Sequence, residues 1–316
     1  MAKRKVKKGL SSILILLILF VVGWQFITKF NEPSETLSSS TPAPPASGEN
    51  LLIAEFLDVD QADCELIHLP DGKILLIDAG ERGDGEEIVA YLKSKDITRI
   101  DYLVATHPHS DHIGGMSDVV DSFEIGKIFA PRVAENDTPT SKTYKEFLAS
   151  VQSKGLKMHA AKSGSTLFEG TDYKAECVAP NSHDYDELND YSVAIKLSYG
   201  IHSFLFTGDA EALSETEMIN AGYNLDCDVL KVGHHGSESS SSDAFLRATT
   251  PTYAVISCGE DNDYGHPHRE TLTALNRLHG LKKLLRTDYD KTVIFTADGK
   301  TENGISFTTQ NPTVVE

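Results

Sequence analysis

Thr106-His107-Pro108-His109-Ser110-Asp111-His112-Ile113-Gly114-Gly115 is the stretch of this 316-residue chain that decides its fold. It places three histidines and one aspartate within six residues. The apolar run 101–105 precedes it, and residues 116–120 read as part of a helix that we expect from His112 to about Ser122. We therefore expect the stretch on a turn between a strand and a helix. Imidazole and carboxylate are ordinary ligands of zinc-like ions. On such a turn, His107 and His109 can bind one ion while Asp111 and His112 bind a second.

The alternative is a polar loop that is merely rich in histidine, but clustered ligands are a much stronger signal than single histidines. The pattern H-x-H-x-D-H before a glycine pair resembles the signature of the metallo-β-lactamase superfamily of hydrolases. This resemblance implies an α+β fold, a four-layer αββα sandwich, with the site at one sheet edge. It also implies two divalent metal ions as cofactors, most readily zinc, with manganese as the alternative.

Two later segments repeat the arrangement of an apolar strand followed by polar groups. Residues 204–209 end in Thr-Gly-Asp, and the resemblance assigns Asp209 the bridge between the two ions. Residues 228–237 run from an apolar strand into Gly-His-His-Gly-Ser, and one of these histidines should complete the second ion's ligands. His234 is favoured because it directly follows the strand-ending glycine, as in related hydrolases. His235 is the alternative.

Further candidates follow the strand 253–259, in Asp263-Tyr264-Gly265-His266-Pro267-His268. The histidines should face the same edge, as a ligand or as groups that hold substrate phosphate, unless the segment is a plain loop. His266 is the metal candidate here, and His268, His266 or Tyr264 can orient phosphate or assist the leaving group. Asp111 or Asp209 can accept a proton.

Asp78 lies at the end of an earlier hydrophobic strand, 73–78, before Ala79-Gly80. A turn-forming aspartate before glycine is one reading. A carboxylate that supports the metal histidines from behind is equally consistent, because metal-bound histidines commonly donate their other ring N–H to such a group.

A closer likeness joins the histidine motif to segments 56–59, 69–72, 76–80, 205–209, 231–237, 264–268 and 286–288. Together they look like the exported metallo-hydrolase domain of ComEC-type competence proteins, over nearly all of residues 51–310. The multi-span channel of those DNA-uptake proteins is absent from this sequence. The family's D-V-G-Q-G-D stretch reads D-V-D-Q-A-D at 58–63, a change expected to alter the adjoining loop.

Another departure concerns the histidine that other superfamily members supply between the first motif and the bridging aspartate. Within 181–192 only His183 offers itself, while Asn189 and Ser192 match an Asn-x-x-Ser element of ComEC-like domains. This implies that the first ion is held less tightly than the second.

The amino terminus predicts a membrane anchor. Five basic residues lie within 1–8, and residues 10–27 contain no charged residue among 18 positions, enough to cross a bilayer. Basic residues before this run and acidic ones after it predict a cytoplasmic tail and an exported remainder. Without a convincing cleavage site, an uncleaved signal anchor is favoured over a removed signal peptide. We therefore divide the chain into a tail and single transmembrane helix (1–30), a Pro/Ser-rich linker (31–50) and a hydrolase domain (51–316).

Charge restricts the partners of the exported part. Without the six basic and three acidic residues of positions 1–50, the totals of 29 Lys and Arg and 47 Asp and Glu leave a net charge of −21. This weighs against a domain that grips nucleic acid through a broad basic face. Two divalent ions would still make the cleft locally positive. The four cysteines have no C-x-x-C spacing, and buried free thiols are favoured over disulfides.

These observations predict a membrane-anchored, extracytoplasmic metal-dependent hydrolase. The expected substrate is a phosphodiester such as DNA or an envelope polymer, and the sequence does not identify a protein partner. The alternative is a membrane-tethered accessory or binding module, for DNA uptake or the envelope, that keeps the fold without turnover.

Overall fold

The computed structural model describes residues 50–311, and these fold around two β-sheets. The eight-stranded sheet has the order β15-β14-β1-β2-β3-β4-β5-β6, and the seven-stranded sheet has the order β13-β12-β11-β10-β9-β8-β7. The strands of the first are β1 (Leu52–Phe56), β2 (Glu65–His68), β3 (Ile74–Ile77), β4 (Arg99–Val104), β5 (Glu124–Ala130), β6 (Met158–Ala160), β14 (Val293–Ala297) and β15 (Ile305–Thr309). Those of the second are β7 (Thr166–Glu169), β8 (Tyr173–Ala179), β9 (Ala194–Tyr199), β10 (His202–Phe206), β11 (Val229–Lys231), β12 (Tyr253–Ile256) and β13 (Lys283–Arg286).

The strands are apolar on both faces because each sheet is covered on both sides. In β3, Leu75 and Ile77 pack into the core between the sheets, whereas Ile74 and Leu76 pack into a second core on the outer side. Successive side chains of a strand point to opposite faces, so a continuous apolar run serves both cores. In β10, Phe204 and Phe206 likewise enter the core between the sheets while Leu205 faces outward. This accounts for the unbroken hydrophobic runs in the sequence.

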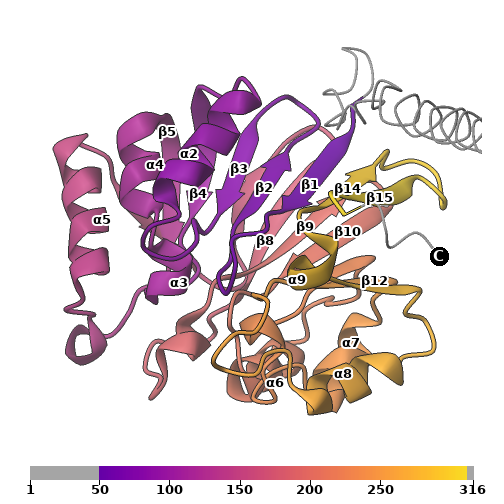
Figure 1. Ribbon diagram of the computed structural model, residues 1–316. Coiled ribbons are helices and arrows are strands. Elements are labelled where there is room, and N and C mark those ends of the chain that lie inside the picture. Colours follow the sequence, from indigo (N-terminus) through magenta and orange to yellow (C-terminus); the bar gives the residue numbers. More distant parts are fainter. Residues whose placement is uncertain (1–49, 312–316) are drawn as a thin grey trace, which may run out of the picture. The chain divides into compact units, whose positions relative to one another are not determined.

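Helices cover the two outer faces, as Figure 1 shows. The first sheet carries α2 (Gly85–Ser94), α4 (Met116–Ser122) and α5 (Lys142–Ser153), and the second carries α6 (Ala212–Asn220), α7 (Asp243–Thr249) and α8 (Arg269–Asn276). The remaining short turns are α3 (Ser110–Ile113), α9 (Thr287–Asp290), and the 3₁₀ turns η1 (Glu135–Asp137), η2 (Leu188–Tyr191) and η3 (His234–Gly236). The predicted order of helices, sheet, sheet and helices is therefore present.

One predicted element differs from the structure. The sequence predicts a single helix over 112–122, but α3 ends at Ile113 and α4 begins at Met116. A Cβ atom on Gly114 would lie 2.0 Å from the backbone of Glu81, and one on Gly115 would lie 2.6 Å from the Ala79 carbonyl oxygen. The glycine pair thus lets this turn pack directly against the backbone that follows β3, and it divides the helix.

Within each sheet, the strands that precede the candidate ligands are parallel to one another. β3 and β4 are parallel neighbours in one sheet, and β10, β11 and β12 are parallel neighbours in the other. Because the carboxyl ends of parallel strands meet at one edge, the loops that follow these five strands converge. The four cysteines are buried and free, so a disulfide plays no part in holding residues 50–311.

The predicted anchor and linker lie outside the described residues, except for Asn50 at the linker's end. Within 50–311, no helix is long and apolar enough to span a bilayer.

Candidate metal centre

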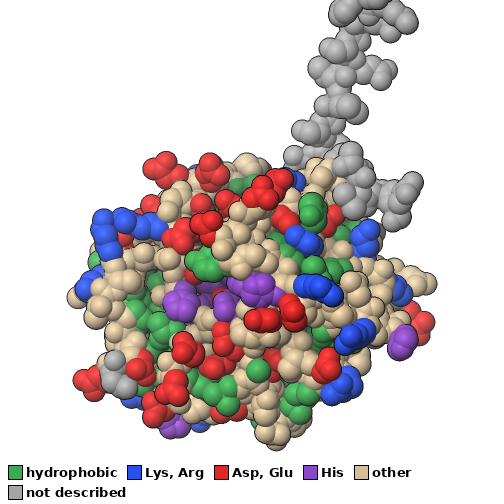
Figure 2. All heavy atoms as spheres, turned by 60° about the horizontal axis from the view of Figure 1, so that its bottom comes forward, with side chains coloured by type: hydrophobic (Ala, Val, Ile, Leu, Met, Phe, Trp, Pro, Cys, Tyr) green, Lys and Arg blue, Asp and Glu red, His purple; other side chains and the backbone are tan. Residues whose placement is uncertain are grey.

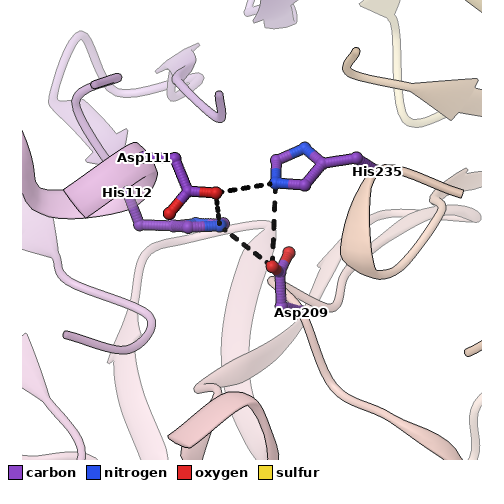
Figure 3. Close-up of side chains that lie close together, drawn as sticks. All are labelled: Asp111, His112, Asp209 and His235. Carbon is purple, nitrogen blue, oxygen red and sulfur yellow. Dashed lines mark ion pairs between the residues drawn. The ribbon is translucent and has the colours of Figure 1, made fainter. Parts of the chain in front are cut away.

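Four of the predicted ligands converge on one point from three loops: Asp111, His112, Asp209 and His235 (Figure 3). One ligand atom from each lies within 4.8 Å of every other. The Nε2 atom of His112 is 3.3 Å from Oδ2 of Asp209, and Nε2 of His235 is 3.3 Å from Oδ2 of Asp111 and 3.6 Å from Oδ2 of Asp209. Asp111 and His112 come from the turn after β4, Asp209 follows β10, and His235 follows β11.

The hydrogen bonds behind the two histidines leave their Nε2 atoms free for an ion. His112 donates from Nδ1 to Oδ2 of Asp78 at 2.7 Å, and His235 donates from Nδ1 to the carbonyl oxygen of Ser257 at 3.0 Å. Both Nε2 atoms, and Oδ1 of Asp209, are buried without a hydrogen-bond partner. Buried polar atoms without partners are costly, so their convergence fits a bound cation. These residues therefore fit the divalent ion that the sequence predicts.

The charges of the group also call for a cation. Burial alone would raise the pKa of Asp209, but the imidazoles of His112 and His235 hold it well below its usual value. Burial alone would lower the pKa of His235, but Asp209 and Asp63 raise it to about 10. The carboxylates thus attract positive charge, which protons supply when no ion is bound. Because ligand histidines must be deprotonated, binding of a metal would release protons.

The histidines of the first predicted ion lie beside this group. Nε2 of His107 is 3.0 Å from Nδ1 of His109 and 3.9 Å from Oδ2 of Asp209. Burial lowers the pKa of His107 well below its usual value, so the ring is in the neutral, ligating form. Asn189, from the segment in which a third histidine was sought, lines the same cleft, and its Oδ1 atom is buried without a partner. Oδ2 of Asp209 thus lies within 4 Å of the Nε2 atoms of His107, His112 and His235.

Of the two histidines that the sequence left as candidates, the structure brings the alternative, His235, into the ligand group instead of the favoured His234. Both residues adopt left-handed backbone angles, with φ of 49° and 50°. The result is that His235 turns inward, where its side chain is 2% exposed, while His234 turns toward the cleft at 23% exposed. Nδ1 of His234 lies 3.0 Å from Oε1 of Glu211, and its Nε2 is 3.9 Å from Asp209. The geometry therefore assigns the ligand position to His235.

The remaining candidates line or border an open cleft of about 300 Å³ above the group. Tyr264 and His266 are both in its wall, with nearly parallel rings whose centroids are 5.6 Å apart. Nδ1 of His266 contacts the side chain of Gln61 at 3.3 Å, so the ring belongs to the cleft rather than to the four-residue group. His268 accepts from the Glu238 amide through Nδ1 and contacts the Tyr264 carbonyl through Nε2, which makes it a support of this loop. Figure 2 shows the histidine side chains gathered at the centre of this face, with acidic side chains around them.

Asp78 lies behind a candidate metal ligand, which is one of the two positions that the sequence suggests for it. It is fully buried and accepts from the Thr106 amide at 2.8 Å as well as from His112. Ser192, matched only by resemblance, links two ligand segments, because its Oγ accepts from the Asp209 amide at 3.0 Å and lies 3.3 Å from Nδ1 of His107.

Two buried residues beneath the group, Asp63 and Lys231, were not predicted as site residues. The sequence does contain one indication of such a pair, which is a single lysine inside the apolar strand 229–232. A lysine buried there needs an acidic partner. Its partner is 168 positions away in sequence, so the pairing itself could not be read.

The fold and the site together define a metal-binding αββα protein of the hydrolase type. The chain belongs to the metallo-β-lactamase superfamily, whose match covers residues 57–260. It is similar to ComE operon protein 3 of Bacillus subtilis (strain 168), with 28% identity over 76% of this chain and 32% of that protein. It is also similar to competence protein ComA of Neisseria gonorrhoeae, with 32% identity over 78% of this chain and 32% of that protein.

The chain thus spans about a third of the length of these competence relatives. Among solved structures, it is similar to the metallo-β-lactamase fold protein YhfI from Bacillus subtilis. That match has a TM-score of 0.48 and 12% identity and covers 74% of this chain and 96% of that one.

Proposed function

We propose that this protein is a metal-dependent hydrolase of phosphodiesters. The observation that carries the proposal is the convergence of two unpartnered imidazole Nε2 atoms with the carboxylates of Asp111 and Asp209 at the floor of an open cleft. Carboxylate and imidazole groups that hold ions beside an accessible cleft are the usual basis of metal-assisted hydrolysis.

Each group then has a definite task. His112, His235, Asp111 and Asp209 would hold one ion, and His107 and His109, with Asp209 shared, would hold the other. Bound ions of this kind lower the pKa of water toward neutrality and neutralise charge that develops on phosphate oxygens. Asp111, whose Oδ2 atom points into the group, can accept the proton that the attacking water loses. From the cleft wall, His266 can orient the phosphate, and the exposed ring of Tyr264 can contact the substrate beside it.

The substrate that we propose is a polyanion. The positive charge of the metal ions in the cleft, rather than a basic protein surface, would attract it. Residues 51–316 carry a net charge of −21, which weighs against a broad basic footprint for nucleic acid. The competence proteins among the relatives favour a DNA strand, and an envelope phosphodiester is the other candidate.

We also propose that residues 10–27 anchor the chain in the membrane and that residues 51–316 act outside the cytoplasm. In a bacterial expression host, protease added to spheroplasts should then degrade residues 51–316 while a cytoplasmic marker survives. Protection of the hydrolase domain until the cells are lysed would contradict this orientation.

Activity is tested with the full chain loaded with zinc or manganese and given bis-p-nitrophenyl phosphate. Asp209→Ala and His109→Ala should abolish hydrolysis, whereas Glu260→Ala, a change in a neighbouring groove, should preserve it. A panel of single-stranded DNA, RNA, cyclic dinucleotides, teichoic-type diesters and lactams then ranks the substrates. If the wild-type protein retained metal but cleaved none of the diesters, the binding-module alternative would replace this proposal.

A further inference from the structure

Beneath the metal group lies a buried ion pair to which the proposed reaction gives no role. Asp63 and Lys231 are each 1% exposed, and Nζ of Lys231 lies 2.6 Å from Oδ2 of Asp63. Asp63 belongs to the loop between β1 and β2, whereas Lys231 is the last residue of β11. The pair therefore joins the two sheets directly below the point where their ligand loops meet.

Asp63 contacts three of the four ligand residues. Its Oδ1 atom is 3.4 Å from Nδ1 of His235, and its Oδ2 atom is 3.8 Å from Nδ1 of His112. Its backbone amide donates to the carbonyl oxygen of Asp111 at 3.1 Å. The N–H on Nδ1 of His235 thus faces two oxygens, Oδ1 of Asp63 and the carbonyl oxygen of Ser257. Two acceptors on this side favour the tautomer whose Nε2 lone pair points to the ion.

Lys231 fixes the carboxylate in this position. Oδ1 of Asp63 makes only the longer contact of 3.4 Å with Nδ1 of His235, so the 2.6 Å pairing of Oδ2 with Lys231 is what determines how the carboxylate is turned. Nζ of Lys231 also donates to the Val232 carbonyl oxygen at 3.1 Å, and His235 follows four residues after Lys231. Buried carboxylates repel one another unless a cation compensates them, and Asp78, Asp111 and Asp209 lie nearby. The lysine supplies that compensation without occupying the ligand atoms.

We propose that the Asp63–Lys231 pair is a positioning device that aligns the imidazole of His235 for the metal ion and holds the two ligand-bearing sheets in register. In this role the pair binds neither the ion nor the substrate, because Oδ2 of Asp63 is engaged by Lys231. Its effect should appear as metal affinity and ligand geometry, so it can be measured without any knowledge of the substrate.

The test measures Co²⁺ binding to the full chain by its visible absorption, with thermal unfolding of each metal-free variant followed by circular dichroism. The variants are Lys231→Met, Asp63→Asn and the double variant Asp63→Asn/Lys231→Met. The control is Lys196→Met, since Lys196 is also buried in the second sheet but its Nζ has no hydrogen-bond partner. The double variant matters because it removes one negative and one positive charge together, so the net charge of the buried group does not change.

We expect Lys231→Met to unfold at a lower temperature than the double variant, and the double variant to bind Co²⁺ about 10–100-fold more weakly than the wild type. The absorption band of its bound Co²⁺ should shift, because the geometry at His235 has changed. Lys196→Met should retain the wild-type affinity and spectrum.

Wild-type affinity and spectrum in both Asp63→Asn and the double variant would overturn the proposal and leave the pair as a fold element only. An equal loss of Co²⁺ affinity in Lys196→Met would also overturn it, because the effect would then be general to buried lysines. These outcomes are separate from the proposed hydrolysis, which can fail while the pair still controls metal binding.

Discussion

Replacement of either member of the His234-His235 pair by alanine should weaken metal binding to very different extents. His235 is buried, and its Nε2 lies 3.3 Å from Asp111 and 3.6 Å from Asp209. His234 is partly exposed, and its Nδ1 is engaged with Glu211 and with Oγ of Ser239, each at 3.0 Å. The two variants are a matched comparison, because they delete the same side chain at neighbouring positions of one loop.

The expected loss of affinity can be estimated by dividing the free energy of metal binding equally among the ligands. Zinc sites with four protein ligands are worth about 10–16 kcal/mol at neutral pH, or roughly 2.5–4 kcal/mol for each ligand. Loss of His235 should therefore weaken binding by about 10²–10³-fold, since 1.4 kcal/mol corresponds to a factor of ten. Loss of His234, whose Nε2 is 3.9 Å from Oδ2 of Asp209, should cost less than about tenfold.

The assay is competition for Zn²⁺ between the metal-free protein and a chromophoric chelator at fixed pH. Circular dichroism of the metal-free variants checks that both are folded. The reasoning would be refuted if His234→Ala lost at least as much affinity as His235→Ala. That outcome would mean that the ligand loop turns by one residue when the ion binds.

Three further predictions concern the cleft, the ligand loop and acid stability. If the protein hydrolyses diesters, Tyr264→Ala should raise KM for bis-p-nitrophenyl phosphate about fivefold, because the exposed ring is the surface that contacts the substrate. Tyr264→Phe keeps the ring and should change KM little. A fall in kcat alone, measured by steady-state kinetics, would contradict this prediction. Glu215→Ala should destabilise the fold by about 2–5 kcal/mol, because the buried carboxylate accepts two backbone amides of the serine-rich loop, and urea unfolding should show a smaller loss for Glu215→Gln. Burial alone would raise the pKa of Glu55, but hydrogen bonds from His68 and Tyr91 help to lower it overall. The stability that ionised Glu55 contributes is therefore complete above the ordinary pKa of a glutamate and is lost as pH falls through the lowered pKa. The free energy of unfolding should consequently drop less steeply between about pH 6 and pH 3 in Glu55→Gln than in the wild type. An equal slope in the two proteins would refute that assignment.

The sequence predicts those candidate ligands whose positions depend only on nearby residues. His107, His109, Asp111 and His112 lie within one turn, so their spacing alone brings them together once a strand precedes and a helix follows. Asp209 was identified in the same way, as a carboxylate directly after an apolar strand. The parallel arrangement of β4 and of β10 to β12 then turns separate motifs into one centre.

What sequence could not supply is backbone direction and distant pairing. The choice between His234 and His235 depends on two successive left-handed residues, which no pattern of residue types at that loop reveals. Asp60, which stands where the family's stretch has glycine, takes φ of 57°, a conformation open to glycine and tolerated by aspartate. The expected change in the adjoining loop stays a prediction. The pairing of β1 with β14, across more than 200 residues, was also not predicted from local signals.

The most direct test of the metal centre is anomalous diffraction from crystals of the zinc-loaded protein, recorded on both sides of the zinc absorption edge. The account predicts a peak at about 2.0–2.2 Å from Nε2 of His112 and of His235, with a carboxylate oxygen of Asp209 at a similar distance. A strong zinc peak bound by other residues, with these three side chains turned away from it, would contradict the account.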